Sequence, residues 1–142
     1  AQGYPSMLGK FPTMNGSDNV TLFRVEEMHL IAAETSLRAG NSADALSYLN
    51  NIPAIRGLGA DYYASATLDN ILEERRKEFA FEGLRFHDLS RMGMDMPVID
   101  SFKQSNDDLA GTPPSYGSYR YAYPISLSER NAKPNMVQNY GY

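Results

Sequence analysis

The stretch EERRKEFAFEGLRFHDLSR, residues 73–91 of this 142-residue chain, holds the densest group of side chains that could do chemistry. Glu78 and Glu82 stand four residues apart, so a helix would bring them to the same side. Like charges at this spacing repel one another, which a simple solvated helix face does not explain. Two further interpretations are a pair of carboxylates that hydrolyses a glycosidic bond and a partly buried network of ion pairs.

The ion network is the favoured interpretation, because two glutamates on one turn of a packed helix do not flank a cleft that holds a sugar. A solvated face would use pairs along the helix, such as Arg75 with Glu78. A network would instead draw cations from another helix, and Arg24 and Arg56 are the candidate donors. The predicted network residues are Arg24, Arg75, Glu78, Glu82, Arg85 and Asp88.

Metal and cofactor chemistry finds little support in the sequence. Glu26 and His29 have the spacing of one half of a carboxylate-bridged di-iron site, but no second motif of this kind exists, since Leu84 precedes His87 by three residues. The chain has no cysteine and carries no phosphate-binding glycine loop. We therefore predict no metal, no cofactor and no catalytic residues.

Loop tyrosines are the candidates for ligand binding. A tyrosine ring packs on the apolar face of a sugar while its hydroxyl stays in water, and the chain has no tryptophan to do this. Tyr121 and Tyr123 alternate toward Pro124, which favours a packing role for both. The remaining candidates for ligand contact are Tyr62, Tyr63, Tyr116 and Tyr119.

Helices must position these residues. Apolar residues from Leu22 to Leu37 recur at helical spacing, and Gly40 follows them. A second helix is expected to start at Ser42 as its N-cap and to end or kink at Pro53. The short connection predicts an antiparallel helical hairpin. Thr67 should cap a long third helix that runs to about Met92.

The length and the net charge of the chain limit the fold and the partners that we expect. A chain of 142 residues can bury one sizeable core, so we predict a single mostly α-helical domain over residues 1–142, wrapped by long irregular loops. The net charge of −4 argues against nucleic acid as a partner. No apolar run is long enough to span a bilayer.

Three blocks of sequence resemble the SusD/RagB family of outer-membrane lipoproteins of Bacteroidetes. They are FRVEEMHLIAAETSLRAGNSADALSYLNNI, ATLDNILEERRKEFAFEGLRFHDLSRMG and YPISLSERNAKPNMVQNYGY, in this order. The resemblance covers the chain from about Val20 to Tyr142 and matches the C-terminal part of much longer proteins. The residues that match the family pattern look like scaffold: Arg24, Glu27, Glu34, Glu74, Arg75, Glu78, Glu82, Gly83, Arg85, Asp88 and Arg91.

The resemblance implies a helical protein with tetratricopeptide-like hairpins that is not an enzyme. It implies binding of a nutrient, an oligosaccharide or a peptide, at the cell outer membrane, together with a SusC-like TonB-dependent transporter. The lipid-anchor cysteine and the N-terminal helical pairs of the family are not in this chain, so we expect either that it is an excised segment or that the rest was lost. The alternative function is a helical protein-interaction scaffold that binds no small molecule.

Overall fold

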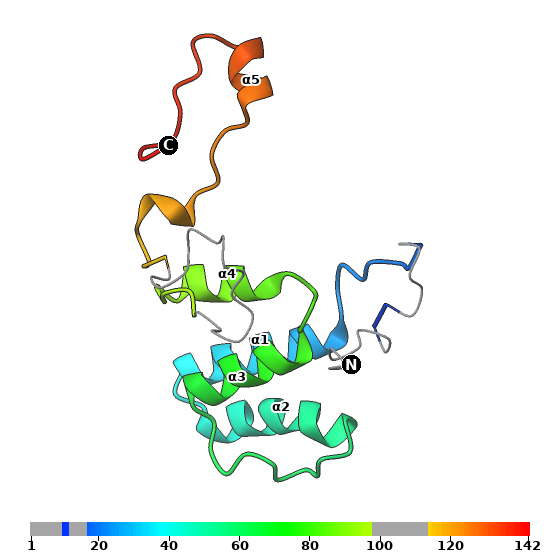
Figure 1. Cartoon of the computed structure of the whole chain (residues 1–142). Coiled ribbons are helices and arrows are strands. Elements are labelled where there is room, and N and C mark those ends of the chain that lie inside the picture. The colour runs from blue at the N-terminus through cyan, green and yellow to red at the C-terminus, as the bar shows by residue number, and fades with distance from the viewer. Residues whose placement is uncertain (1–9, 12–16, 98–113) are drawn as a thin grey trace, which may run out of the picture. The chain divides into compact units, whose positions relative to one another are not determined.

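The structure is a computed structural model that describes residues 10–11, 17–97 and 114–142 (Figure 1). These residues form helices and no strand. The helices are α1 (Val25–Arg38), α2 (Ser42–Ile55), α3 (Leu68–Glu78), α4 (Leu84–Arg91), the 3-10 turn η3 (Tyr119–Tyr121) and α5 (Leu127–Ala132). The predicted mostly helical fold is therefore confirmed.

The chain divides into two compact units, Ala1–Gly83 and Leu84–Tyr142, and each is described by itself. Two compact units can belong to one domain, so the single domain over residues 1–142 stays a prediction.

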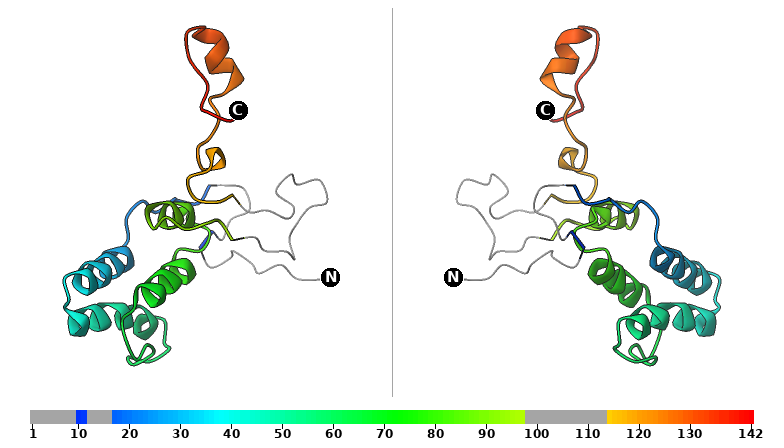
Figure 2. Two further views of the ribbon diagram at one scale, coloured as in Figure 1. Left: turned by 90° about the vertical axis from the view of Figure 1, so that its left-hand side faces the viewer. Right: turned by 90° about the vertical axis from the view of Figure 1, so that its right-hand side faces the viewer.

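The first unit is a helical hairpin with a third helix against it. A three-residue turn joins α1 to α2, and α3 packs on both helices (Figure 2). The fully buried side chains come from all three helices: Leu30, Ala33, Ala45, Leu49, Ile52 and Ile71. Burial of a leucine or isoleucine contributes roughly 1.5–3 kcal/mol, so this apolar contact is the main force that holds the hairpin to α3.

Local signals at the helix ends act largely as the sequence predicts. Gly40 has a φ of 83°, a left-handed conformation that glycine adopts at low cost after a helix. The Thr67 hydroxyl accepts a hydrogen bond from the amide of Asn70 at 3.1 Å and so caps α3. One expectation was wrong, because Asn41 is the N-cap of α2 and Ser42 is its first helical residue. The helix continues two residues past Pro53 to Ile55, so Pro53 does not end it, and the alternative that Pro53 kinks the helix stays a prediction.

The predicted long third helix is also interrupted. The helical conformation ends at Glu78 and starts again at Leu84, and Phe81 and Gly83 between them have φ angles of 68° and 79°. These left-handed values cannot continue a right-handed helix. Side chains from distant parts of the chain also compete for its carbonyls: Arg24 Nη2 and Lys10 Nζ both donate to the carbonyl oxygen of Glu78.

In the second unit, the C-terminal sequence QNYGY, residues 138–142, is bonded to the segment just before α5. The Gln138 side chain accepts from the amide of Ile125 at 2.8 Å and donates to its carbonyl at 3.0 Å. Asn139 Nδ2 donates to the carbonyl of Tyr123 at 2.7 Å. Gly141 has a φ of 96° and lies so close to the Tyr119 ring that a Cβ atom would stand 2.3 Å from it. The side-chain amides of Gln138 and Asn139 thus hold two backbone segments together, as backbone hydrogen bonds would do in a β-sheet.

Candidate functional site

The charged residues of the opening stretch meet at the C-terminal end of α3. Arg24, the residue just before α1, donates from Nη1 to Glu78 Oε1 at 2.7 Å and from Nε to Glu82 Oε2 at 3.1 Å. Its guanidinium carbon also lies 5.0 Å from the centre of the Phe79 ring, within range of a cation–π interaction. One arginine therefore joins the two glutamates that would otherwise repel one another.

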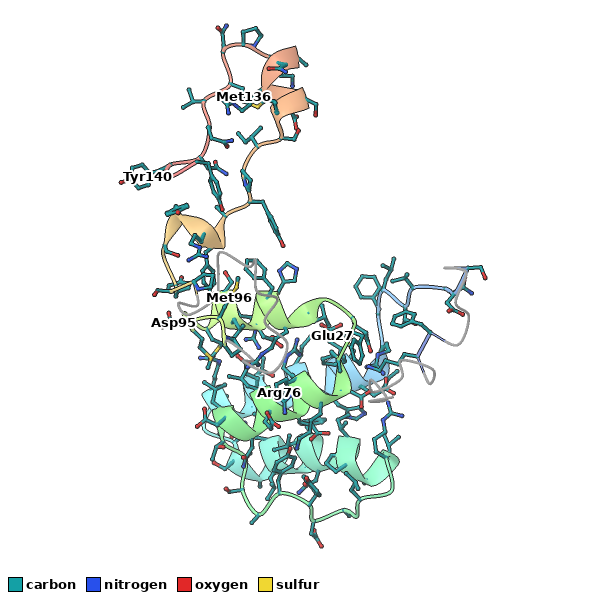
Figure 3. All side chains as sticks on the ribbon, in the orientation of Figure 1. Glu27, Arg76, Asp95, Met96, Met136 and Tyr140 are labelled. Carbon is teal, nitrogen blue, oxygen red and sulfur yellow. The ribbon has the colours of Figure 1, made fainter. Side chains whose placement is uncertain are left out.

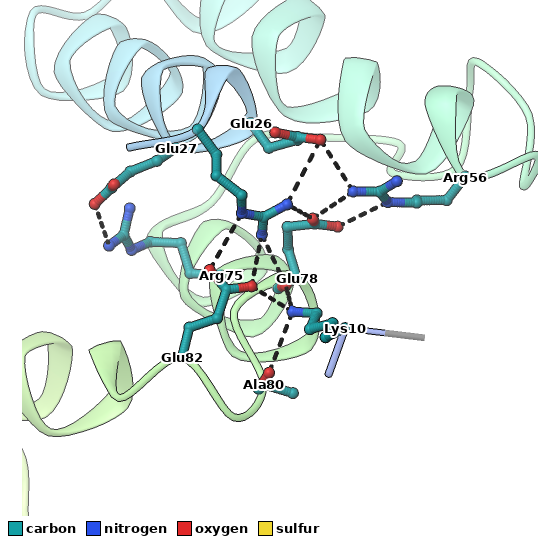
Figure 4. A network of polar contacts seen from close by, with 9 residues as sticks. Lys10, Glu26, Glu27, Arg56, Arg75, Glu78, Ala80 and Glu82 are labelled. Carbon is teal, nitrogen blue, oxygen red and sulfur yellow. Dashed lines mark hydrogen bonds and ion pairs between the residues drawn. The ribbon is translucent and has the colours of Figure 1, made fainter. Parts of the chain in front are cut away.

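Arg56, which follows the last residue of α2, supplies a second guanidinium. Its Nε donates to Glu78 Oε2 at 3.0 Å and its Nη2 to Glu78 Oε1 at 2.5 Å, so the two groups form a bidentate pair. The same Nη2 lies 3.1 Å from Glu26 Oε1 on α1 (Figure 4). Glu78, which is only 7% exposed, is thus held by cations from two different helices.

Lys10, in the N-terminal segment, supplies a third cation to the network. Its ammonium group donates to Glu82 Oε1 at 2.5 Å and to the carbonyl oxygen of Ala80 at 3.2 Å (Figure 4). The sequence interpretation missed this residue. Lys10 stands 72 residues before Glu82, in a stretch rich in glycine and proline. No helical pattern surrounds it there, so the sequence does not indicate that it pairs with Glu82.

The electrostatic balance at Glu78 argues against a role for this residue as the general acid of a glycosidase. Burial raises the pKa of its carboxyl, but hydrogen bonds from Arg56 and then Arg24 outweigh burial and hold the pKa below its ordinary value. The general acid of a glycosidase needs the opposite shift, because it must hold a proton near neutral pH. Glu78 is therefore ionised and fully engaged, as expected of a structural ion pair.

The other three predicted network residues lie outside this cluster. Arg75 is buried and contacts Glu27 at 3.8 Å and the face of Phe79 at 5.2 Å. Asp88, in the second unit, accepts from Arg91 Nε at 2.9 Å. Arg85 forms no ion pair with another described residue. The structure brings together Arg24, Glu78 and Glu82 and adds Lys10, Glu26 and Arg56 to them.

Glu26 and His29 do not face one site. Glu26 pairs with Arg56, whereas His29 Nδ1 lies 3.3 Å from the side-chain nitrogen of Asn51 and its ring lies beside Tyr48. No group of three or more histidine, cysteine or acidic side chains suited to a metal is present among the described residues.

Two of the candidate tyrosines lie in the loop between α2 and α3. Tyr63 is fastened at three points: its amide donates to Asn50 Oδ1, its carbonyl accepts from Asn50 Nδ2, and its hydroxyl donates to Glu74 Oε2 at 2.7 Å. Burial, followed by the hydrogen bond to Glu74, raises the pKa of its hydroxyl. Tyr62 is 46% exposed, and Lys77 Nζ lies 5.3 Å from its ring centre. The loop therefore offers Tyr62 to solvent and uses Tyr63 as an anchor.

The other two lie in the second unit. Tyr116 is 53% exposed and meets Tyr121 edge to face, while its amide donates to Asp95. Tyr119 is 45% exposed, with Gly141 against its ring and Tyr142 edge to face with it. Each ring thus keeps about half of its surface in water.

The two tyrosines that were expected to pack behave differently. The Tyr121 ring lies 5.7 Å from that of Phe86, and its hydroxyl donates to the carbonyl of Met94. Tyr123 is 83% exposed although its ring centre is 6.3 Å from that of Phe86, so the packing expectation was wrong for this residue. An alternating pattern predicts opposite faces but cannot tell how far each face is covered.

The chain matches a known protein family over most of its length. Residues 9–142 match the SusD family. The starch-binding protein SusD of Bacteroides thetaiotaomicron is 33% identical over 124 residues, which are 87% of this chain and 22% of that protein. The SusD-like protein P25 of Formosa agariphila is 28% identical over 139 residues, 90% of this chain and 25% of that protein.

Solved structures agree with the sequence match. A SusD superfamily protein from Bacteroides thetaiotaomicron has a TM-score of 0.71 at 33% identity, covering 92% of this chain and 30% of that one. Another from Bacteroides vulgatus has a TM-score of 0.67 at 32% identity, covering 91% and 31%. This chain thus spans less than a third of each relative.

The family match and the helical fold together define the class of protein to which this chain belongs. The chain belongs to the SusD family, and the prediction of that family is confirmed. Its members are binding proteins and not enzymes, which confirms the prediction on catalysis. Across the described part of the chain, every helix is too short or too polar to pass through a bilayer.

Proposed function

We propose that this chain is part of a cell-surface protein that binds a nutrient glycan. The observation that carries the proposal is the match to the SusD family over residues 9–142, together with 33% identity to a protein named for starch binding. The ion network supports the proposal indirectly, because it joins the ends of α1, α2 and α3 and so gives the loops between them a fixed frame.

Exposed tyrosine rings are the proposed contacts. Tyr62, Tyr116 and Tyr119 each keep 45% or more of their surface exposed, which leaves ring area for a sugar to cover. Tyr63 belongs to the same set of candidates, but its hydroxyl and backbone are already bonded within the protein. Its proposed part is to hold Tyr62 in place, with the two rings edge to face at 4.8 Å.

The proposal includes the setting that the family resemblance implies. The protein acts at the outer membrane beside a SusC-like TonB-dependent transporter, to which it delivers an oligosaccharide or a peptide. Support for this part is the family membership alone.

A protein-interaction scaffold remains the second candidate because of an exposed apolar stripe on α1. Val25, Met28 and Ile31 follow one another at intervals of three residues and are 69%, 48% and 44% exposed. These residues lie on a different side of the helix from the buried Leu30 and Ala33. Contiguous apolar surface of this kind often marks contact with another protein.

A titration with oligosaccharides separates the two candidates. Maltoheptaose and a panel of other neutral oligosaccharides are added to the chain while tyrosine fluorescence is recorded. Glycan binding predicts a saturable change that weakens in Tyr62→Ala, Tyr116→Ala or Tyr119→Ala. The matched control is Tyr48→Ala, which removes an exposed ring from the middle of α2. A saturable change that all three loop substitutions leave intact would remove these tyrosines from the site, and no change with any sugar would favour the scaffold.

A further inference from the structure

The second unit contains a small cavity with aromatic walls, and none of the four tyrosines proposed above as ligand contacts lines it. Its volume is about 140 Å³, and its lining is Phe86, Met96, Arg120, Tyr121, Ala122, Tyr123 and Tyr142. Met96, one of the lining residues, is labelled in the view with side chains (Figure 3). All the lining residues belong to the one unit, Leu84–Tyr142.

The rings in this lining are fixed by contacts of their own. Tyr121 packs on Phe86 and donates its hydroxyl to the carbonyl of Met94. Tyr142 donates its hydroxyl to the carbonyl of Ala122 at 2.9 Å. Because both hydroxyls are already bonded to backbone, these residues offer a ligand their ring carbons, which suit the C–H faces of a sugar.

Arg120 is the charged group of the lining. Its side chain forms no ion pair or hydrogen bond with another residue in the described part of the chain, although it is half-buried. The acids of the described second unit are engaged elsewhere or lie outside the lining: Asp88 pairs with Arg91, Asp95 accepts from Tyr116, and Glu129 lies on α5. Arg120 therefore lines an aromatic cavity and has guanidinium donors that no described residue engages.

We propose that this cavity binds the carboxylate-bearing sugar unit of an acidic glycan, with Arg120 on the carboxylate and the rings of Phe86 and Tyr121 beside the sugar. A guanidinium and a carboxylate match in shape and form two parallel hydrogen bonds. The cavity is smaller than the roughly 300 Å³ at the lower end of drug-sized sites, so it accommodates one sugar unit rather than a chain. The inference rests on the proposed glycan binding and narrows it to uronate-containing ligands.

The test compares D-glucuronate with D-glucose, which share a ring and differ in the carboxylate. Each is titrated into the ¹⁵N-labelled chain while the Arg120 Nε–Hε signal and the backbone amide signals of the lining residues Tyr121 and Ala122 are followed by NMR, so that the variant without Arg120 can be compared as well. We expect glucuronate to shift this signal saturably and to bind about tenfold more tightly than glucose, because a charge-assisted bidentate contact is lost in glucose. Acetate serves as a third probe for a carboxylate without a ring.

Two substitutions test whether Arg120 causes the tighter binding of glucuronate. Arg120→Met should abolish the advantage of glucuronate over glucose, since it keeps an unbranched apolar stem and removes the charged guanidinium group. Arg130→Met, on α5 and outside the cavity lining, removes the same charge and should leave the advantage unchanged. Equal binding of glucuronate and glucose would overturn the inference, as would an advantage that survives Arg120→Met. Acetate that binds as tightly as glucuronate would overturn the assignment of a sugar ring.

The outcomes also separate this inference from the broader proposal. Neutral oligosaccharides that bind while glucuronate has no advantage would overturn the inference and leave the glycan-binding function standing. No binding of glucuronate at concentrations on the order of 10 mM, where even weak sites fill, would overturn the inference as well. Glucuronate binding without any binding of neutral sugars would uphold it and restrict the function to acidic ligands.

Discussion

Glu78, which is itself buried, accepts hydrogen bonds from Arg24 and from the half-exposed Arg56. Replacing it with glutamine keeps the size of the side chain but leaves two guanidinium groups facing a neutral amide. We expect Glu78→Gln to lower the free energy of unfolding by about 1–3 kcal/mol, the usual loss when a buried charged hydrogen bond is broken. Chemical denaturation followed by circular dichroism measures the change.

The control for this substitution is Glu73→Gln on the same helix. Glu73 is bonded to Arg76 at 2.6 Å, but both side chains are about half exposed. Exposed pairs contribute roughly 0–1 kcal/mol, so this variant should unfold almost as the parent does. Equal effects of the two substitutions would mean that the network at Glu78 behaves like an ordinary surface pair.

The lowered pKa of Glu78 also makes stability depend on pH. A carboxyl whose pKa is lower in the folded than in the unfolded state stabilises the fold above its unfolded value of about 4.3, and the contribution disappears as pH falls through the folded pKa. We expect the midpoint of thermal unfolding to fall steeply below about pH 4, and less steeply in Glu78→Gln. A parent and variant with parallel pH profiles would show that other carboxyls cause the acid sensitivity.

At the scale of single residues, the sequence predicts part of the network, although Arg24 and Arg56 flank helices and Glu82 lies in the break after α3. Arg24 and Arg56 could be named as donors because helix periodicity puts Glu78 and Glu82 on one side and leaves them without local partners. Lys10 could not be named, because only the folded chain brings the N-terminal segment to the end of α3. Arg85 and Asp88 were included on the assumption of a continuous helix, which the break after Glu78 removes.

At the scale of helices, the two N-caps offer a direct comparison. Thr67 accepts a hydrogen bond from the amide of Asn70, whereas Ser42 is already inside α2 and makes no capping bond. Thr67→Ala should therefore cost about 1 kcal/mol in the free energy of unfolding, and Ser42→Ala only a few tenths. Both variants are measured by thermal denaturation. A larger loss for Ser42→Ala would restore it as the N-cap that the sequence suggested.

The break between α3 and α4 leads to a second prediction at this scale. Phe81 holds a φ of 68°, which costs a residue with a side chain roughly 1–2 kcal/mol but costs glycine little. We expect Phe81→Gly to be more stable than Phe81→Ala by about 1 kcal/mol, since both lose the exposed ring and only glycine relieves the backbone. An alanine variant as stable as the glycine variant would show that the segment adopts another conformation in solution.

Sequence patterns predict the helices themselves better than their ends. The spacing of apolar residues indicates α1, α2 and α3, because burial of one helix face leaves this pattern wherever it occurs. A phenylalanine in a left-handed conformation leaves no such pattern, and only Gly83 hinted that the third helix would stop early. Asn41 and Ser42 are both good N-cap residues, so the choice between them depends on backbone geometry that sequence does not contain.

At the scale of the whole molecule, the size of the chain limits what its surface can bind. It spans 22% of the starch-binding relative and about 30% of the structures it resembles. The candidate tyrosines are distributed over two units, Tyr62 in the first and Tyr116 and Tyr119 in the second. The sequence could identify them by composition and by their place in loops. It could not show that Tyr63 is anchored while Tyr62 is exposed, because that difference depends on contacts with Asn50 and Glu74.

The affinity of the chain for a glycan should therefore be weak. A site made of a few exposed rings covers little of a sugar, and we expect a dissociation constant of about 1 mM or more, which corresponds to roughly −4 kcal/mol or a smaller magnitude. The measurement is isothermal titration with maltoheptaose, run in parallel on this chain and on the starch-binding protein of Bacteroides thetaiotaomicron. We expect the longer protein to bind at least about tenfold more tightly, because more of its surface can close around the ligand. If the two bind equally well, the whole site lies within residues 1–142, and the tyrosine substitutions should then abolish binding rather than reduce it.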